Sequence, residues 1–288
     1  MKDKSKNTFW KERKKANRDE LSEWMVTKND KMERIYDTQK NMENVTSHFE
    51  SLFRQPAGSE HPYHEETKNI LLAFKEDTNY DSEWYNKCPT ESEILHIIEN
   101  KKNNKASTGI KNEMIKNVKI PFVRILMPVI QAVWEEETIP TMWNEGRITS
   151  LYKGKGDREV LSNHRGITYG DSIGDILEEA IHNRIAPIVP FTQSQAGGIK
   201  GASTCDHVFI IRSIILLAIT SKRNVFLTFY DIAKAYDHAD VPIMLRVLWE
   251  RGFKGKAWRI LKNMCENLTA RINTRHGVAR IIKCEVGG

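Results

Sequence analysis

The stretch FLTFYDIAKAYD, residues 226–237, limits what this chain can fold into more than any other stretch does. It opens with an apolar, aromatic run that ends at Asp231, and a second aspartate, Asp237, follows six residues later. An apolar run bounded by polar residues is typical of a buried strand. We therefore expect Asp231 at the edge of a rigid sheet, where its carboxylate is well placed to bind a divalent metal ion.

The composition is that of a folded protein with a basic surface. Of the 288 residues 40% are apolar, which is enough for the core of one large domain or two smaller ones. The net charge of +6 and the pI of about 9.0 favour a polyanionic partner, although a mild basic excess is also common on proteins without one.

Cysteine spacing and hydropathy indicate an intracellular protein of the nucleus or cytoplasm. The four cysteines are widely spaced and form no C-x-x-C pair, which predicts reduced structural thiols rather than a zinc site. The charged N-terminus lacks the apolar core of a signal peptide. The longest apolar run, residues 208–219, is interrupted by polar residues and too short to span a bilayer, so we expect no membrane segment.

Residues 1–90 are predicted to form a helical, basic N-terminal extension and linker. Sparse apolar residues at helical spacing in residues 1–53 indicate helices that need a partner surface. Residues 54–66 are rich in turn formers and predict a loop. The first eighteen residues carry eight Lys and Arg, which suits a phosphate-binding arm, and equally a solvated helix or a frayed terminus.

Residues 91–190 are predicted to form a second region of helices and a strand pair. Thr90 and Glu93 form a capping-box pattern that opens the first of its helices. A glycine-spaced basic turn begins at Lys153, and a second basic point lies at Arg165. Two basic points beside a strand pair suit the binding of a triphosphate, and an ordinary charged hairpin is the alternative. The expected elements are helices over residues 121–137 and about 174–185 and strands over residues 146–152 and 163–168.

Residues 191–288 are predicted to form a third region. A glycine-rich turn leads to a helix that runs to about residue 220, with Ser203 or Thr204 as its cap. The strand that carries Asp231 follows, and Asp240 caps the next helix. The remaining expected elements are a helix over about residues 255–267 and two strands over residues 269–273 and 278–284.

Five short elements in this order resemble the reverse transcriptase domain of non-LTR retrotransposons of the LINE type, in particular jockey-like elements. The resemblance runs from about Val45 to the last residue, and the order and spacing carry its specificity. It implies an α+β fold in which residues 91–190 are the fingers and residues 191–288 part of the palm of a right-hand polymerase, preceded by the helical extension. The five elements are KNNKASTGIKNEMIK, Trp143 with ITSLYKGKGD, NHRGIT, QAGGIKGASTCDH and FYDIAKAYD.

The resemblance also implies a function, an RNA-directed DNA polymerase that adds deoxynucleotides to a primer by two-metal phosphoryl transfer with Mg²⁺ or Mn²⁺. Its partners would be an RNA template, a DNA primer and deoxynucleoside triphosphates; nothing in the sequence points to a protein partner. The implied roles are metal binding by Asp231 and by the backbone carbonyl of Ile232, a steric gate at Tyr236, positioning by Asp237, triphosphate binding by Lys153 and Arg165, and packing beside template and primer by Gln195, Gly201, Ser203 and Thr204.

The chain departs from the family pattern at several positions. Ser107-Thr108-Gly109 replaces the usual Pro-Gly and Asp, Gly198 and Ile199 stand where an aromatic and a basic residue are frequent, and Asp175 stands where lysine is frequent. The glycine-glutamine motif and the Asp-Asp motif would lie beyond Gly288. We therefore expect a truncated polymerase that is inactive alone, with an unpaired palm edge and poor solubility.

Two other functions remain open at the level of sequence. A non-catalytic, nucleic-acid-binding remnant of a retroelement would use the same basic residues without the chemistry. A purely structural helical protein would make the match at DIAKAYD, residues 231–237, accidental, which the other four elements argue against.

Overall fold

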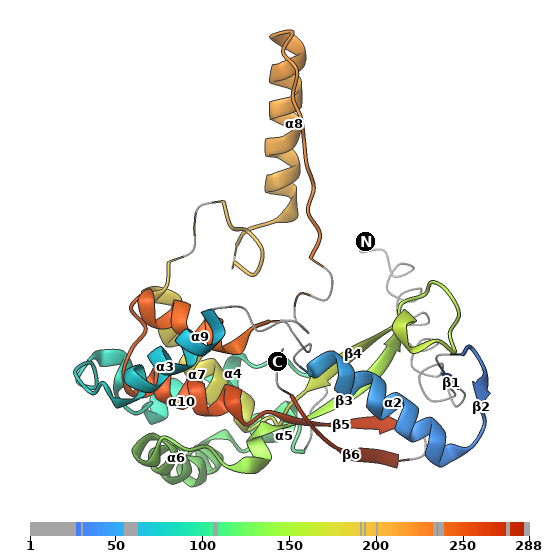
Figure 1. Ribbon diagram of the computed structural model, residues 1–288. Helices are drawn as coiled ribbons and strands as arrows, with labels where there is room; N and C mark the ends of the chain where they lie inside the picture. The colour runs from blue at the N-terminus through green and yellow to red at the C-terminus, as the bar shows by residue number, and fades with distance from the viewer. Residues whose placement is uncertain are drawn as a thin grey trace, which may run out of the picture.

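The computed structural model describes residues 27–29, 31–54, 63–105, 109–190, 192, 194–199, 201–232, 235, 239–274 and 277–284. These residues form a mixed helix and sheet structure, which confirms the α+β class (Figure 1). The helices are α2 (Thr38–Phe53), α3 (Tyr63–Glu76), α4 (Glu91–Asn100), α5 (Asn112–Asn117), α6 (Lys119–Glu136), α7 (Gly174–Ile188), α8 (Thr204–Thr220), α9 (Val241–Glu250) and α10 (Lys256–Glu266), with short 3₁₀ turns at Trp84–Asn86, Thr141–Asn144 and Leu161–Asn163.

The strands form a two-stranded and a four-stranded sheet. In the larger sheet the order is β4-β3-β5-β6, with β3 parallel to β5 and the other pairs antiparallel. The parallel pair joins segments that are more than a hundred residues apart in the chain, with Ile148 opposite Ile272. The strands are β1 (Thr27–Lys28), β2 (Arg34–Ile35), β3 (Glu145–Tyr152), β4 (His164–Tyr169), β5 (Thr269–Thr274) and β6 (Gly277–Lys283).

Helix α2 covers one face of the four-stranded sheet (Figure 1). Its apolar residues Val45, Phe49 and Phe53 recur at helical spacing and pack on Ile148 of β3 and on small and branched residues of β5 and β6. Asp37 caps the helix by accepting a hydrogen bond from the Lys40 backbone N–H at 2.8 Å. This packing confirms the prediction that the N-terminal part contains a helix in need of a partner surface.

The other helices build a separate apolar core beside the sheet. Helix α4 packs on α6 and α7, α3 packs on α9, and α10 contacts α9 and α6. Trp258 and Phe253 are fully buried in this core. Helix α3 starts at Tyr63, inside the stretch predicted as a loop, so that prediction is wrong for residues 63–66.

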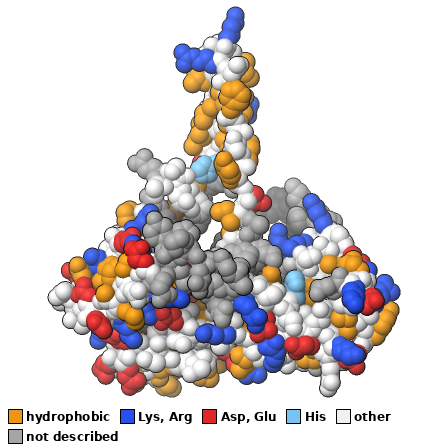
Figure 2. All heavy atoms as spheres, in the orientation of Figure 1, with side chains coloured by type: hydrophobic (Ala, Val, Ile, Leu, Met, Phe, Trp, Pro, Cys, Tyr) orange, Lys and Arg blue, Asp and Glu red, His pale blue; other side chains and the backbone are white. Residues whose placement is uncertain are grey.

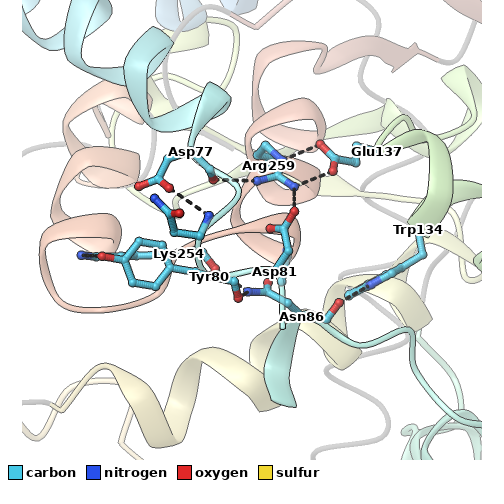
Figure 3. Close-up of polar contacts among 10 residues, drawn as sticks. Asp77, Tyr80, Asp81, Asn86, Trp134, Glu137, Lys254 and Arg259 are labelled. Atoms are coloured by element: carbon cyan, nitrogen blue, oxygen red, sulfur yellow. Dashed lines mark hydrogen bonds and ion pairs between the residues drawn. The ribbon is translucent and has the colours of Figure 1, made fainter. Parts of the chain in front are cut away.

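A buried arginine joins the loop before α4 to helices α6 and α10 (Figure 3). The Arg259 guanidinium donates to both carboxylate oxygens of Glu137, at 2.6 and 2.7 Å, and to Asp81 at 2.7 Å. It also donates to the carbonyl of Asp77 at 3.1 Å. Because the planar fork satisfies acceptors from two segments at once, it fixes the loop against α10.

Helix α8 and the residues that follow it leave the body of the molecule together. We call α8 and residues 221–232 the arm; Figure 1 shows it projecting from the rest of the chain. None of the residues of α8 is buried. Figure 2 shows hydrophobic side chains along the arm and basic side chains at its far end. Lys222 and Arg223 follow shortly after the end of α8.

The strand predicted at Asp231 does not form, so this prediction is wrong. Residues 223–232 are irregular and exposed, and they belong to neither sheet. The backbone N–H and C=O groups of a strand need a neighbouring strand as hydrogen-bond partner. In the four-stranded sheet β3 pairs with β4 and β5, and residues 223–232 pair with no strand of it. The apolar run revealed a tendency to be buried without showing which partner would bury it.

Candidate functional site

The β3–β4 hairpin brings the two predicted triphosphate-binding cations together. Arg165 on β4 lies opposite Leu151 on β3, and Lys153 follows two residues after Leu151. The Lys153 backbone N–H donates to the Asn163 carbonyl at 2.8 Å and so continues the pairing beyond the strand end. Paired residues and residues two apart share a face, so Lys153 and Arg165 are diagonal neighbours on the same face. Both side chains are exposed.

The opposite face of the hairpin is held against α2. Gly166 lies so close to Phe49 that a Cβ atom at this position would come within 2.9 Å of the Phe49 ring. His164 is buried beside it; its Nε2 donates to the Arg158 carbonyl at 2.7 Å and its Nδ1 lies 3.0 Å from the Ser150 hydroxyl. Burial lowers the pKa of His164, and the nearby charges of Arg158 and Lys153 lower it further.

The face that carries Lys153 and Arg165 is not covered by α2, and we call it the open face. Its residues are exposed or half-buried. Tyr169 bridges the strands of this face, because its hydroxyl accepts hydrogen bonds from Thr149 at 3.4 Å and from Asn273. By register the open face comprises Arg147, Thr149 and Leu151 of β3, Arg165, Ile167 and Tyr169 of β4, and Arg271 and Asn273 of β5.

Two further arginines lie on the open face, and Glu145 pairs with both. Arg271 Nε is 3.0 Å from Glu145 Oε1, and Arg147 Nη2 is 3.5 Å from the same oxygen. These residues and Tyr169 were not predicted as site residues, because no local pattern in the sequence shows which strands pair or which side chains then share a face. Cations, amide and hydroxyl groups and an aromatic ring on one surface suit a polyanionic ligand.

The predicted metal ligands, Asp231 and the Ile232 carbonyl, lie next to each other where the arm ends in sequence. Asp231 and Ile232 are exposed at the end of the arm. Tyr236 and Asp237 lie outside the described residues. Among the described residues no group of three or more His, Cys, Asp or Glu side chains could hold a metal ion. Mg²⁺ and Mn²⁺ prefer several oxygen ligands, and the metal role of Asp231 stays a prediction.

The predicted template and primer residues form the entry to the arm. Gln195 closes a turn through its side-chain amide, which donates to the Gly197 carbonyl at 3.0 Å. Gly201 has a φ of +88°, a conformation that favours glycine. Ser203 caps α8, as predicted, with the Asp206 carboxylate accepting from the Ser203 N–H at 2.9 Å, and Thr204 is the first helical residue. These contacts are structural and do not test a role beside nucleic acid.

Comparison with known proteins supports a relationship to reverse transcriptases. No model of a known protein family matches the chain. The chain is similar to a probable RNA-directed DNA polymerase from transposon BS of Drosophila melanogaster, with 23% identity over 194 residues. The match covers 63% of this chain and 21% of that protein, so the chain spans about a fifth of the length of the curated relative it matches. In the described residues no helix is both long enough and apolar enough to cross a membrane.

Proposed function

We propose that the chain is part of an RNA-directed DNA polymerase of a mobile element, and that its β3–β4 hairpin binds the triphosphate of the incoming deoxynucleotide. One observation carries the proposal: Lys153 and Arg165, twelve positions apart in sequence, are exposed diagonal neighbours on a single sheet face. The similarity to a transposon polymerase supports the same function.

In this reaction the two cations would neutralise the negative charge of the triphosphate and hold it in position. The 3′-hydroxyl of a primer attacks the α-phosphorus of the nucleotide and pyrophosphate leaves, so negative charge must be held at the β- and γ-phosphates. Arg165 can donate two parallel hydrogen bonds to phosphate oxygens, and Lys153 supplies a compact charge beside it. Lys153 Nζ donates to the Ser162 carbonyl at 2.8 Å. Because the carbonyl is uncharged, a negatively charged phosphate oxygen is the stronger acceptor and can replace it.

The remaining roles are proposed on the resemblance alone. Asp231 and the Ile232 carbonyl would bind the catalytic Mg²⁺ or Mn²⁺, Tyr236 would exclude ribonucleotides, and Asp237 would position the nucleotide. RNA template and DNA primer would pass beside residues 195–204.

The proposal is tested by titrating the full chain with a deoxynucleoside triphosphate and with inorganic tripolyphosphate in a calorimeter. We expect Lys153→Ala and Arg165→Ala each to weaken binding of both ligands by roughly 10-fold or more, the value of a charge-assisted hydrogen bond. Arg124→Ala, which removes an equally exposed cation from α6, is the matched control and should leave the affinity unchanged. Equal affinities in all four proteins would contradict the proposal.

A second function, nucleic-acid binding without chemistry, is favoured by the open face itself. Its arginines and Tyr169 lie on three adjacent strands, β4, β3 and β5. A chain that binds an RNA–DNA duplex with a steep salt dependence, but binds no triphosphate, would support this function over the first.

A further inference from the structure

The loop that presents Lys153 carries charges of both signs. We call residues 153–160 the basic loop; it contains Lys153, Lys155 and Arg158 together with Asp157 and Glu159. Two flanking side chains hold its backbone: the Tyr152 hydroxyl donates to the Gly156 carbonyl at 2.6 Å, and the Asn163 side-chain amide donates to the Asp157 carbonyl at 2.8 Å. Unpaired carboxylates in such a loop would oppose the approach of a phosphate.

Residues 27–35 supply the partners of both carboxylates. Lys28 Nζ lies 2.6 Å from Asp157 Oδ2 and 3.7 Å from Glu159 Oε2, and Arg34 Nε lies 2.8 Å from the same Glu159 oxygen. The Lys28 backbone N–H also donates to the Glu159 carbonyl at 2.9 Å. The hydrogen bond between the two side chains raises the pKa of Lys28 and lowers that of Asp157, as expected of a favourable pair.

The same residues are fixed to the body of the molecule. Thr27 is fully buried; its hydroxyl donates to Asn41 Oδ1 at 2.5 Å and accepts from Asn44 at 2.8 Å. Both asparagines belong to α2, the helix that packs on the sheet. A continuous series of contacts therefore runs from α2 through β1 to the basic loop.

We propose that Lys28 and Arg34 are positioning residues of the phosphate-binding site, which hold the basic loop in place and neutralise Asp157 and Glu159 so that Lys153 and Lys155 face an anionic ligand unopposed. The inference rests on the proposed function for the identity of the ligand, a nucleoside triphosphate. It makes residues 27–35 part of the site, although they are more than a hundred positions away in sequence.

A substitution can remove the charge of Asp157 and keep the hydrogen bond that its side chain accepts within the loop. Its Oδ1 accepts the Glu159 N–H at 2.9 Å, and asparagine keeps an oxygen in that place. Lys28→Gln leaves the Asp157 charge unpaired, whereas Lys28→Gln with Asp157→Asn removes both charges and allows a neutral hydrogen bond. If Lys28 neutralises Asp157, the added Asp157→Asn restores the phosphate binding that Lys28→Gln loses. If Lys28 only supports folding, it does not.

The test measures tripolyphosphate binding by the full chain and its variants at low salt. We expect Lys28→Gln and Arg34→Gln to weaken binding by about two- to fivefold, the range of an exposed ion pair, and Lys28→Gln with Asp157→Asn to restore it. Arg280→Gln is the matched control, since it unpairs Glu43 and Glu50 on the surface of α2 and should not alter binding. Lys28→Gln that binds like the wild type, or a double variant as weak as Lys28→Gln, overturns the proposal.

Hydrogen exchange separates this inference from the proposed function. If the wild-type chain binds neither tripolyphosphate nor a deoxynucleoside triphosphate, the proposed function fails. The positioning role is then judged on the backbone amides of residues 153–160, which should exchange faster in Lys28→Gln than in the wild type or in Arg280→Gln. Unchanged exchange in this loop overturns the positioning role as well.

Discussion

At the scale of single residues, the most constrained side chain is Arg259. Its side chain is 5% exposed, and its guanidinium donates to two carboxylates and a carbonyl, so hydrogen bonds replace the hydration lost on burial (Figure 3). The sequence predicts the helix over residues 255–267 but not this network. Its acceptors lie at Asp77, Asp81 and Glu137, which only the fold brings together.

We predict that Arg259→Lys destabilises the chain by roughly 2–4 kcal/mol, because lysine cannot span both carboxylates and leaves them poorly paired. The loss should fall short of that of a fully buried pair, since Asp81 and Glu137 keep 28% and 26% of their side chains exposed. Urea unfolding followed by circular dichroism measures the difference. Arg280→Lys, at a pair with 47% exposure of the arginine, is the control and should cost less than about 1 kcal/mol.

At the scale of elements, predictions from local signals are confirmed. The Thr90 capping box opens α4, Asp240 caps α9, and the alternation in residues 146–152 forms β3. These signals depend on neighbours a few residues away, which the sequence displays directly. The strand expected at Asp231 failed for the opposite reason, because a strand there depends on a partner strand far along the chain.

The hairpin predicts a pH dependence through His164. Its pKa in the folded chain is lowered from 6.5 by burial, so the unfolded chain takes up the proton first as the pH falls. Stability should therefore be at its full value above about pH 6.5 and decrease as the pH falls from there towards the lowered pKa. The groups that face the ring are Arg158, Lys153, Ser150 and Tyr152.

Urea unfolding at pH 7.5, 6.5 and 5.5 tests this dependence against His164→Gln, which can keep one donor and one acceptor without titrating. The comparison of the two proteins cancels the contribution of every other group. We expect the free energy of unfolding to decrease less in His164→Gln between pH 6.5 and 5.5 than in the wild type. Parallel pH profiles would show that the imidazole does not contribute.

At the scale of the whole molecule, the described chain has two packed cores and an arm that joins neither. One core lies between α2 and the four-stranded sheet, and the other lies among α3, α4, α6, α7, α9 and α10. The cores draw on segments from both halves of the chain, so the order of regions along the sequence does not predict how they pack. Asp231 belongs to the arm, whereas Lys153 and Arg165 belong to the β3–β4 hairpin.

The arm yields a prediction about local stability. A helix apolar on all sides is stabilised mainly by packing, and no residue of α8 is buried, whereas α10 buries Ala257, Trp258 and Ile260 completely. We expect the amides of α8 to exchange with solvent several orders of magnitude faster than those of α10, because local unfolding of α8 breaks no core contact. Hydrogen–deuterium exchange with mass spectrometry resolves both helices in one experiment. Protection of α8 equal to that of α10 would show that its apolar surface is covered in solution, and with it the segment that carries Asp231.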